Sequence, residues 1–247
     1  MTPDRWAIAG EDGRCADAGQ EVALYLPALL RTLSVTGCTV LEFAPQRAVE
    51  CPSAVPARLF ALAHDARVST KPGESFHERL LDLGGQVGMF EDVLEPAMAH
   101  QPLDTAVKRF HLSMEELTPK SLQDLCIAAD PANIVLLLSR VNTANGERHL
   151  PMLDFRIRAS EHNQARAVAI AKRLGPGALV ISGSSYHYYG HRLITKLQLS
   201  KWLLQVQLLG QYVDTLWITH QLMEECCALR IGAGHGYTFP PRILETI

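Results

Sequence analysis

The spacing of hydrophobic and polar residues divides most of the chain into helices and strands. Apolar positions that recur every three or four residues predict helices, and short apolar runs predict strands. In the first half, the pattern predicts helices over residues 21–33, 57–66, 103–110 and 118–126 and a strand over 38–43. In the second half, it predicts helices over 161–174 and 197–209 and strands over 133–141, 149–157, 178–182 and 228–231. The glycine-rich stretch 67–90 has weak periodicity, and no element is predicted there.

Turn and capping residues support this division. Asn145 and Gly146 stand between two predicted strands and supply the positive φ of a tight reversal, which favours a β-hairpin. Ser160 is a good N-cap for the helix predicted after it. Strands alternating with helices predict an α+β, mixed α/β fold, with helices packed on a sheet. A boundary near residue 128 would separate an N-terminal part, 1–128, from an α/β unit, 129–247.

Composition narrows the class of protein. The 247 residues are 47% hydrophobic and 20% charged, with a net charge of −3, which is typical of a globular chain. No apolar run approaches the roughly 20 residues that span a bilayer, and the N-terminal residues lack the apolar stretch of an export signal. We therefore expect a cytoplasmic protein that does not enter a membrane. The six cysteines form no C-x-x-C pair, which favours reduced, structural thiols.

The charge is unevenly distributed. Residues 151–201 carry 8 basic and 2 acidic side chains, whereas residues 1–150 carry 13 basic and 20 acidic ones. A basic segment of this kind favours binding of a polyanion or of nucleotide phosphates. The alternative is a solvated helix face whose charges pair with the acidic N-terminal part.

Two short motifs carry polar groups that could perform chemistry. In the strand predicted over 149–157, alternation would place Asp154, Arg156 and Arg158 on one face, where they could bind one ligand or form a surface ion pair. After the strand predicted over 178–182, Ser184, Ser185 and His187 offer hydrogen bonds that suit phosphate oxygens. The alternative for this second motif is a strand end with aromatic core residues.

A third candidate is Asp214, which follows a long apolar helix and could equally be a helix cap. The motifs follow one another in the order of an acidic strand, a strand ending in S-x-H and a later aspartate. In this order they resemble the archaeo-eukaryotic primase superfamily over residues 133–244. The resemblance implies a primase-like core with an RRM-like sheet in the C-terminal half and a helix-rich N-terminal part, which is either an accessory module or the first α/β lobe.

The resemblance also implies roles for individual residues. Asp154, Asp214 and His187 would be catalytic, and the two aspartates would bind Mg²⁺ or Mn²⁺ if the protein is active. Nucleotide or phosphate binding would fall to Arg156, Arg158, Ser184, Ser185, His187 and Arg230. The partners would be a nucleotide or single-stranded nucleic acid, in a setting such as DNA replication.

Arg156 departs from the family pattern, which normally places a second acid at this position. A cation here removes a metal ligand and repels the metals, and one unit-charge contact at 4 Å is worth about 4 kcal/mol at an effective dielectric near 20. Glu42 or Glu161 could compensate. We therefore expect nucleotide or nucleic-acid binding with a degenerate metal site. The alternatives are an active metal-dependent nucleotidyltransferase, and a non-catalytic interaction subunit whose acidic N-terminal part docks a protein partner.

Overall fold

The computed structural model describes residues 18–44, 61–62, 65–66, 68–69, 76–86, 103 and 106–247. The chain divides into two compact units: unit 1 comprises Met1–Ala44 and Ala106–Ile247, and unit 2 comprises Pro45–Thr105. The longest described element of unit 2 is helix α3 (Phe76–Gln86). The boundary predicted near residue 128 lies inside unit 1. The helix predicted over 57–66 falls largely outside the described residues.

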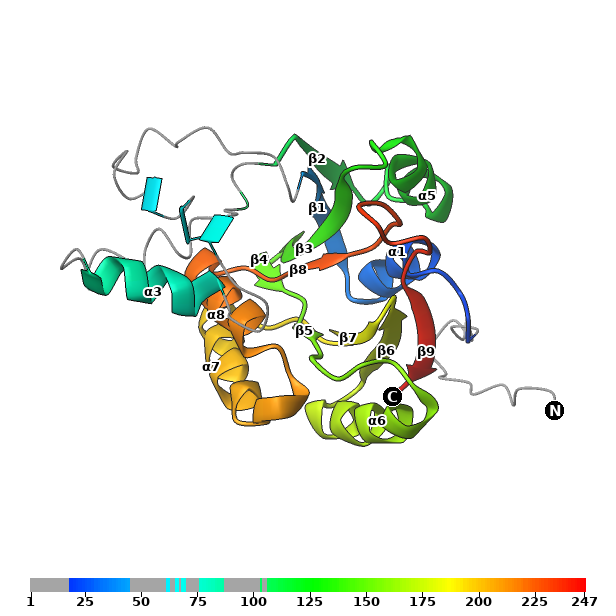
Figure 1. The fold of residues 1–247 in the computed structure, drawn as a ribbon. Coiled ribbons are helices and arrows are strands. Elements are labelled where there is room, and N and C mark those ends of the chain that lie inside the picture. Colours follow the sequence, from blue (N-terminus) through cyan, green and yellow to red (C-terminus); the bar gives the residue numbers. More distant parts are fainter. Residues whose placement is uncertain are drawn as a thin grey trace. The chain divides into compact units, whose positions relative to one another are not determined.

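The first sheet of unit 1 is antiparallel and draws on both halves of the sequence. Its order is β2 (Lys108–Ser113), β1 (Val35–Phe43), β3 (Ile134–Thr143) and β4 (Gly146–His149). Strand β8 (Ala228–Arg230) also pairs with β3, beyond the part of β3 that pairs with β4. Figure 1 shows β3 and β8 side by side, although about 90 residues separate them in the chain.

The second sheet is antiparallel and comes entirely from the C-terminal half. Its order is β5 (Met152–Asp154), β7 (Ser185–Gly190), β6 (Gly177–Ser182) and β9 (Arg242–Thr246). The elements β5, α6, β6 and β7 follow the β-α-β-β order of ferredoxin-like folds. Strand β9 closes the sheet as an edge strand beside β6.

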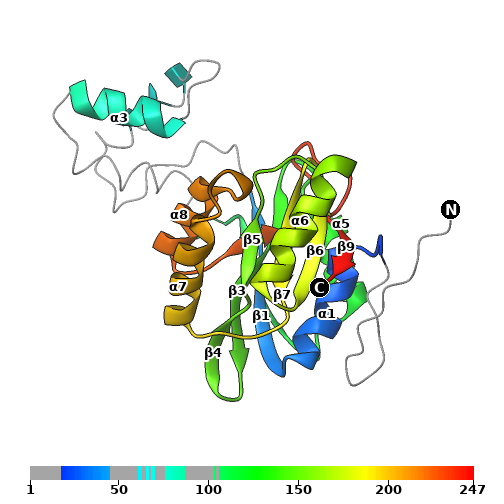
Figure 2. The same ribbon diagram turned by 90° about the horizontal axis from the view of Figure 1, so that it is seen from below.

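Helices cover both sheets. The helices of unit 1 are α1 (Val22–Thr32), α5 (Pro119–Ala128), α6 (Glu161–Leu174), α7 (Lys196–Gln207) and α8 (Thr215–Glu224). Helix α6 lies over β6 and β7, as Figure 2 shows, and α1 packs against β1 and α5. Helices α7 and α8 pack against each other, with α8 also contacting β5. One continuous core of buried side chains, including Leu137, Leu153 and Tyr188, runs through both sheets.

Local sequence signals explain several element boundaries. Thr118 and Ser121 form a reciprocal capping box at the start of α5, and Ser160 caps α6 by accepting from the backbone N–H of Asn163. Gly177 begins β6 where a Cβ atom would lie 2.3 Å from the ring of Tyr188, so only glycine fits. Ser160 thus marks where α6 begins, and Gly177 marks where β6 begins.

The mixed α/β class is confirmed, and most predicted elements of the second half are present. Two predictions are wrong. The strand predicted over 149–157 is interrupted at Leu150-Pro151, so β4 stays in the first sheet whereas β5 joins the second. The helix predicted over 103–110 is wrong because Lys108–Ser113 is strand β2, in which partly buried side chains alternate with exposed ones.

Among the elements that the sequence pattern does not predict are α3, α8 and β7. Strand β7 completes a hairpin with β6 through Gly183 and Ser184, and the φ of +69° at Gly183 suits a two-residue loop. Within the described ranges, no helix has the length and apolar character needed to cross a membrane.

Candidate functional site

The first pair of candidate residues lies on neighbouring strands of the second sheet. Asp154 ends β5 directly opposite His187 on β7. Their side chains share one face of the sheet, and the Nε2 atom of His187 lies 3.7 Å from Oδ1 of Asp154. This separation is longer than a hydrogen bond, so the two groups face each other without a direct hydrogen bond.

Asp214 joins this pair from a different part of the chain. Its backbone N–H donates to the carbonyl oxygen of Asp154 at 3.1 Å. Its own side chain accepts from the backbone N–H of Trp217 at 2.9 Å and thereby caps α8. The structure thus brings Asp154, His187 and Asp214 together. Asp214 is both the N-cap of α8 and a neighbour of Asp154.

Asp154 is in an unusual electrostatic position. Burial, together with the nearby charge of Asp214, raises its pKa from 3.8 to about 8, although Arg230 and a hydrogen bond with Ser185 act in the opposite direction. Its Oδ1 atom is buried and has no hydrogen-bond partner in the part of the chain that the structure describes. The carboxyl group is therefore largely protonated at neutral pH.

His187 is neutral in the same environment. Burial lowers its pKa from 6.5 to about 3, and the positive charge of Arg230 contributes. Its Nδ1 atom is buried and lacks a hydrogen-bond partner among the described residues. A neutral imidazole of this kind can donate or accept a hydrogen bond, but it does not contribute a positive charge.

Arg230 supplies the buried positive charge of the site. It ends β8 with only 5% of its surface exposed. Its guanidinium donates to the carbonyl oxygens of Gly232 (2.6 Å) and Phe239 (3.3 Å) and to the hydroxyl of Ser182 (2.9 Å). The guanidinium carbon also lies 3.9 Å from the centre of the Tyr237 ring. None of these four partners carries a charge at neutral pH.

The remaining predicted phosphate-binding residues differ in their exposure to solvent. Ser184 is exposed in the β6–β7 turn, and its carbonyl oxygen accepts from the N–H of Ala159, which follows the exposed Arg158. Ser185, in contrast, is partly buried beside Asp154. Arg156 is exposed and lies beyond the end of β5, where its N–H donates to the carbonyl oxygen of Tyr212.

A comparison with protein families finds a match over the part of the chain that contains these site residues. A family described as archaeo-eukaryotic primase 1D-like matches residues 113–240, slightly more than half of the sequence. The chain belongs to this family. The match confirms the resemblance seen in the sequence and indicates a function related to nucleotidyl transfer or nucleic-acid binding. No curated protein and no solved structure matches this chain.

The two neighbouring aspartates of this primase-like chain provide fewer carboxylates than a two-cation site requires. The buried, unbonded Oδ1 of Asp154 and the neighbouring carboxylate of Asp214 together offer the oxygen ligands that Mg²⁺ and Mn²⁺ prefer. A two-cation site draws on several carboxylates. Across the described ranges, no group of three or more His, Cys, Asp or Glu side chains is arranged to hold a metal.

The two carboxylates considered as compensation for Arg156 lie elsewhere in the primase-like unit. Glu42 is buried on β1 of the first sheet and accepts from Lys108 (2.7 Å) and Asn133 (2.7 Å), which lower its pKa against the effect of burial. Glu161 is exposed in the first turn of α6. The carboxylate of Glu42 is thus already paired with Lys108 and with the side-chain amide of Asn133.

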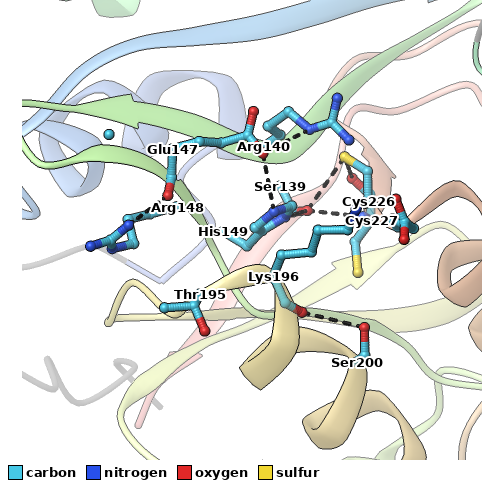
Figure 3. A network of polar contacts seen from close by, with 12 residues as sticks. Ser139, Arg140, Glu147, Arg148, His149, Thr195, Lys196, Ser200, Cys226 and Cys227 are labelled. Carbon is cyan, nitrogen blue, oxygen red and sulfur yellow. Dashed lines mark hydrogen bonds and ion pairs between the residues drawn. The ribbon is translucent and has the colours of Figure 1, made fainter.

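A second polar cluster was missed from the sequence because its members are distant in the chain (Figure 3). The Oγ of Ser139 accepts from the N–H of Cys227 at 2.9 Å and lies 3.2 Å from Nδ1 of His149, whose Nε2 is 3.7 Å from Glu147. The order serine, histidine, glutamate resembles a nucleophile with its base. Ser139 is nevertheless completely buried, so no substrate reaches it. The cluster instead ties β3 and β4 to the segment that leads into β8.

Proposed function

We propose that this protein binds the phosphate groups of a nucleotide or of single-stranded nucleic acid at the site formed by Asp154, His187 and Arg230. The membership in the primase-like family supports a nucleic-acid-related role. The proposal goes further in two ways. It names the residues that bind the ligand, and it expects most metal-dependent catalysis to be lost.

The observation that carries the proposal is the uncompensated charge of Arg230. Among the described residues, uncharged groups accept its hydrogen bonds, and the carboxyl group whose charge acts on it, that of Asp154, is largely protonated at neutral pH. A buried cation without a charged partner is costly unless an anion completes its surroundings. A phosphate at the adjacent surface would do so.

The surface around this charge suits an approaching phosphate. The exposed hydroxyl of Ser184 can donate a hydrogen bond, and the exposed guanidinium groups of Arg156 and Arg158 can add long-range attraction and bidentate contacts. Ser185 and His187 would then contact the ligand from β7. In this arrangement Arg156 favours the phosphates rather than a metal.

A divalent cation, Mg²⁺ or Mn²⁺, would be held by Asp154 and Asp214. Such an ion would neutralise phosphate charge and, in an active enzyme, assist nucleotidyl transfer. Because Arg156 stands where the family has another acid, we expect the chain to retain binding and to lose most or all catalysis.

Binding is tested by fluorescence anisotropy of a labelled single-stranded oligonucleotide and by titration with a nucleoside triphosphate. We expect Arg158→Ala and Arg156→Ala to weaken binding several-fold, and affinity to fall as salt rises. Arg173→Ala is the matched control, because Arg173 is an exposed arginine at the other end of α6 and removes the same charge. If neither ligand binds at low salt, the phosphate site is refuted and the protein-interaction alternative is left.

An active nucleotidyltransferase is the second candidate, and the adjacency of Asp154 and Asp214 favours it. The measurement is extension of a primed template with Mn²⁺. Template-dependent product that disappears in both Asp154→Ala and Asp214→Ala would establish catalysis and refute the degenerate site. Product that persists in both variants would come from a contaminant.

A further inference from the structure

A pocket of about 540 Å³ lies in unit 1 beside the site described above, and its lining includes Gly232 and Tyr237, which contact Arg230. It is bounded by the start of α1, the C-terminal half of α5 and the glycine-rich loop of residues 231–240. Neither Asp154, His187 nor Arg230 lines it. Its size falls within the range of about 300–1,000 Å³ that is usual for small-molecule sites.

The chemistry of the pocket differs from that of the phosphate site. Apolar side chains, among them Ala23, Ile127 and Ile231, form much of its wall, and its polar side chains include Glu21, Gln123 and Asp130. No Lys, Arg or His is among the described residues that line it. The two carboxylates and the absence of a cation there disfavour a phosphate and favour a ligand that donates hydrogen bonds.

Glu21 lines this space and has a carboxylate that does not cap its helix. Although Glu21 is the N-cap residue of α1, its side chain makes no capping hydrogen bond. It accepts instead from Nε2 of Gln123 at 3.3 Å, across the pocket wall. Its charge also adds to the effect of burial in raising the pKa of the Cys126 thiol to about 12. Gln123 and Cys126 both line the pocket, so the carboxylate lies beside two residues of its lining.

Tyr237 gives the pocket a flat aromatic boundary. It belongs to the lining and is 42% exposed. The guanidinium of Arg230, which does not line the pocket, lies 3.9 Å from the centre of its ring and helps to fix it. An aromatic ring held in this way can contact a planar ligand with little loss of side-chain freedom.

We propose that this pocket binds a flat heterocycle that carries an exocyclic amine, as a nucleobase does, and that it does so without a phosphate. The amine donates to the carboxylate of Glu21, and the ring packs against the apolar walls and Tyr237. The proposal does not depend on the phosphate site, because a ligand without phosphate can bind here whether or not nucleotides bind at Arg230.

The test compares two nucleosides by isothermal titration calorimetry on the full chain. Adenosine carries the exocyclic amine, and inosine has a carbonyl oxygen at the same position. We expect adenosine to bind at least tenfold more tightly than inosine, because the carbonyl oxygen would face the carboxylate of Glu21. Equal affinities, or no binding of adenosine, would overturn the proposal.

Three variants assign the binding to this pocket. Glu21→Gln should abolish the preference for adenosine, and Ala233→Trp, which fills the space from the loop, should weaken both nucleosides at least tenfold. Glu161→Gln, which changes an exposed glutamate in the first turn of α6, should change neither affinity. Thermal unfolding of each variant checks that it is folded. Adenosine binding that survives Ala233→Trp would place the nucleoside elsewhere and refute the assignment, whereas loss of binding in Arg158→Ala would attribute it to the phosphate site.

Discussion

The backbone amide of Asp214 donates a hydrogen bond to the carbonyl oxygen of Asp154 at 3.1 Å. This one contact joins the residue before α8 to the end of β5 and brings together two carboxylates that lie sixty positions apart in the sequence. Their mutual repulsion, added to burial, keeps the Asp154 carboxyl protonated at neutral pH. The ionisation of Asp154 therefore makes both stability and cation binding depend on pH.

Replacing Asp154 with Asn should change how stability depends on pH. The folded protein retains this proton up to a pKa of about 8, whereas the unfolded chain releases it near 3.8. The resulting stabilisation is complete below about pH 4 and is lost as the pH rises through 8. Between pH 6.5 and 8, the free energy of unfolding of the natural protein should fall by about 1–2 kcal/mol relative to Asp154→Asn.

Urea unfolding at several pH values measures this difference. His187, whose pKa is lowered by burial, is present in both proteins, so its own contribution to the pH dependence cancels in the comparison. The charged neighbours of Asp154 are Asp214 and Arg230, and both are present in the variant. Parallel pH profiles for the two proteins would contradict the raised pKa of Asp154.

Binding of Mn²⁺ should strengthen with pH. A cation at Asp154 and Asp214 displaces the proton of Asp154, so affinity should rise by up to about tenfold per pH unit below pH 8. Calorimetry in two buffers with different ionisation enthalpies measures the released proton. Asp214→Asn should lower the affinity and Glu161→Gln should leave it unchanged. A pH-independent affinity would mean that the cation binds elsewhere.

Gly177→Ala should destabilise unit 1 strongly, by about 3 kcal/mol or more, because the new Cβ atom would overlap the ring of the buried Tyr188. Gly146→Ala is the matched comparison. Gly146 has a φ of +92° but nothing within 4 Å of its added Cβ atom, so only backbone strain of about 1–2 kcal/mol is expected. Chemical denaturation of both variants tests the order, and equal losses would show that the Tyr188 ring yields freely.

Ser139→Ala should cost about 1–3 kcal/mol, since the buried N–H of Cys227 and Nδ1 of His149 would both lose their partner. Ser200→Ala serves as the control, because the Ser200 hydroxyl only donates to a carbonyl oxygen of its own helix. The control should stay within about 0.5 kcal/mol of the natural protein. A Ser139→Ala protein of unchanged stability would rule out the structural role of the cluster.

Local signals made much of the second half of the chain predictable. Ser160 and the glycines after Leu174 mark both ends of α6, and Asn145-Gly146 marks the reversal between β3 and β4. Asp154, His187 and Asp214 could be named as a group only through the resemblance to a primase, because nothing in their spacing shows that they meet. No local pattern predicts strand β7 or helix α8, and the apolar pattern of residues 103–110 predicts a helix although Lys108–Ser113 is strand β2.

By itself, the sequence determined the mixed α/β class, the family and the identities of the candidate residues, because caps, turns and periodicity act over a few positions. Tertiary structure alone decided that the chain crosses from one sheet to the other after His149, that uncharged partners surround Arg230, and that Glu21 lines a pocket. Sheet pairing, burial and the pKa of Asp154 depend on contacts between residues that are far apart in the chain. A local sequence pattern does not predict such contacts.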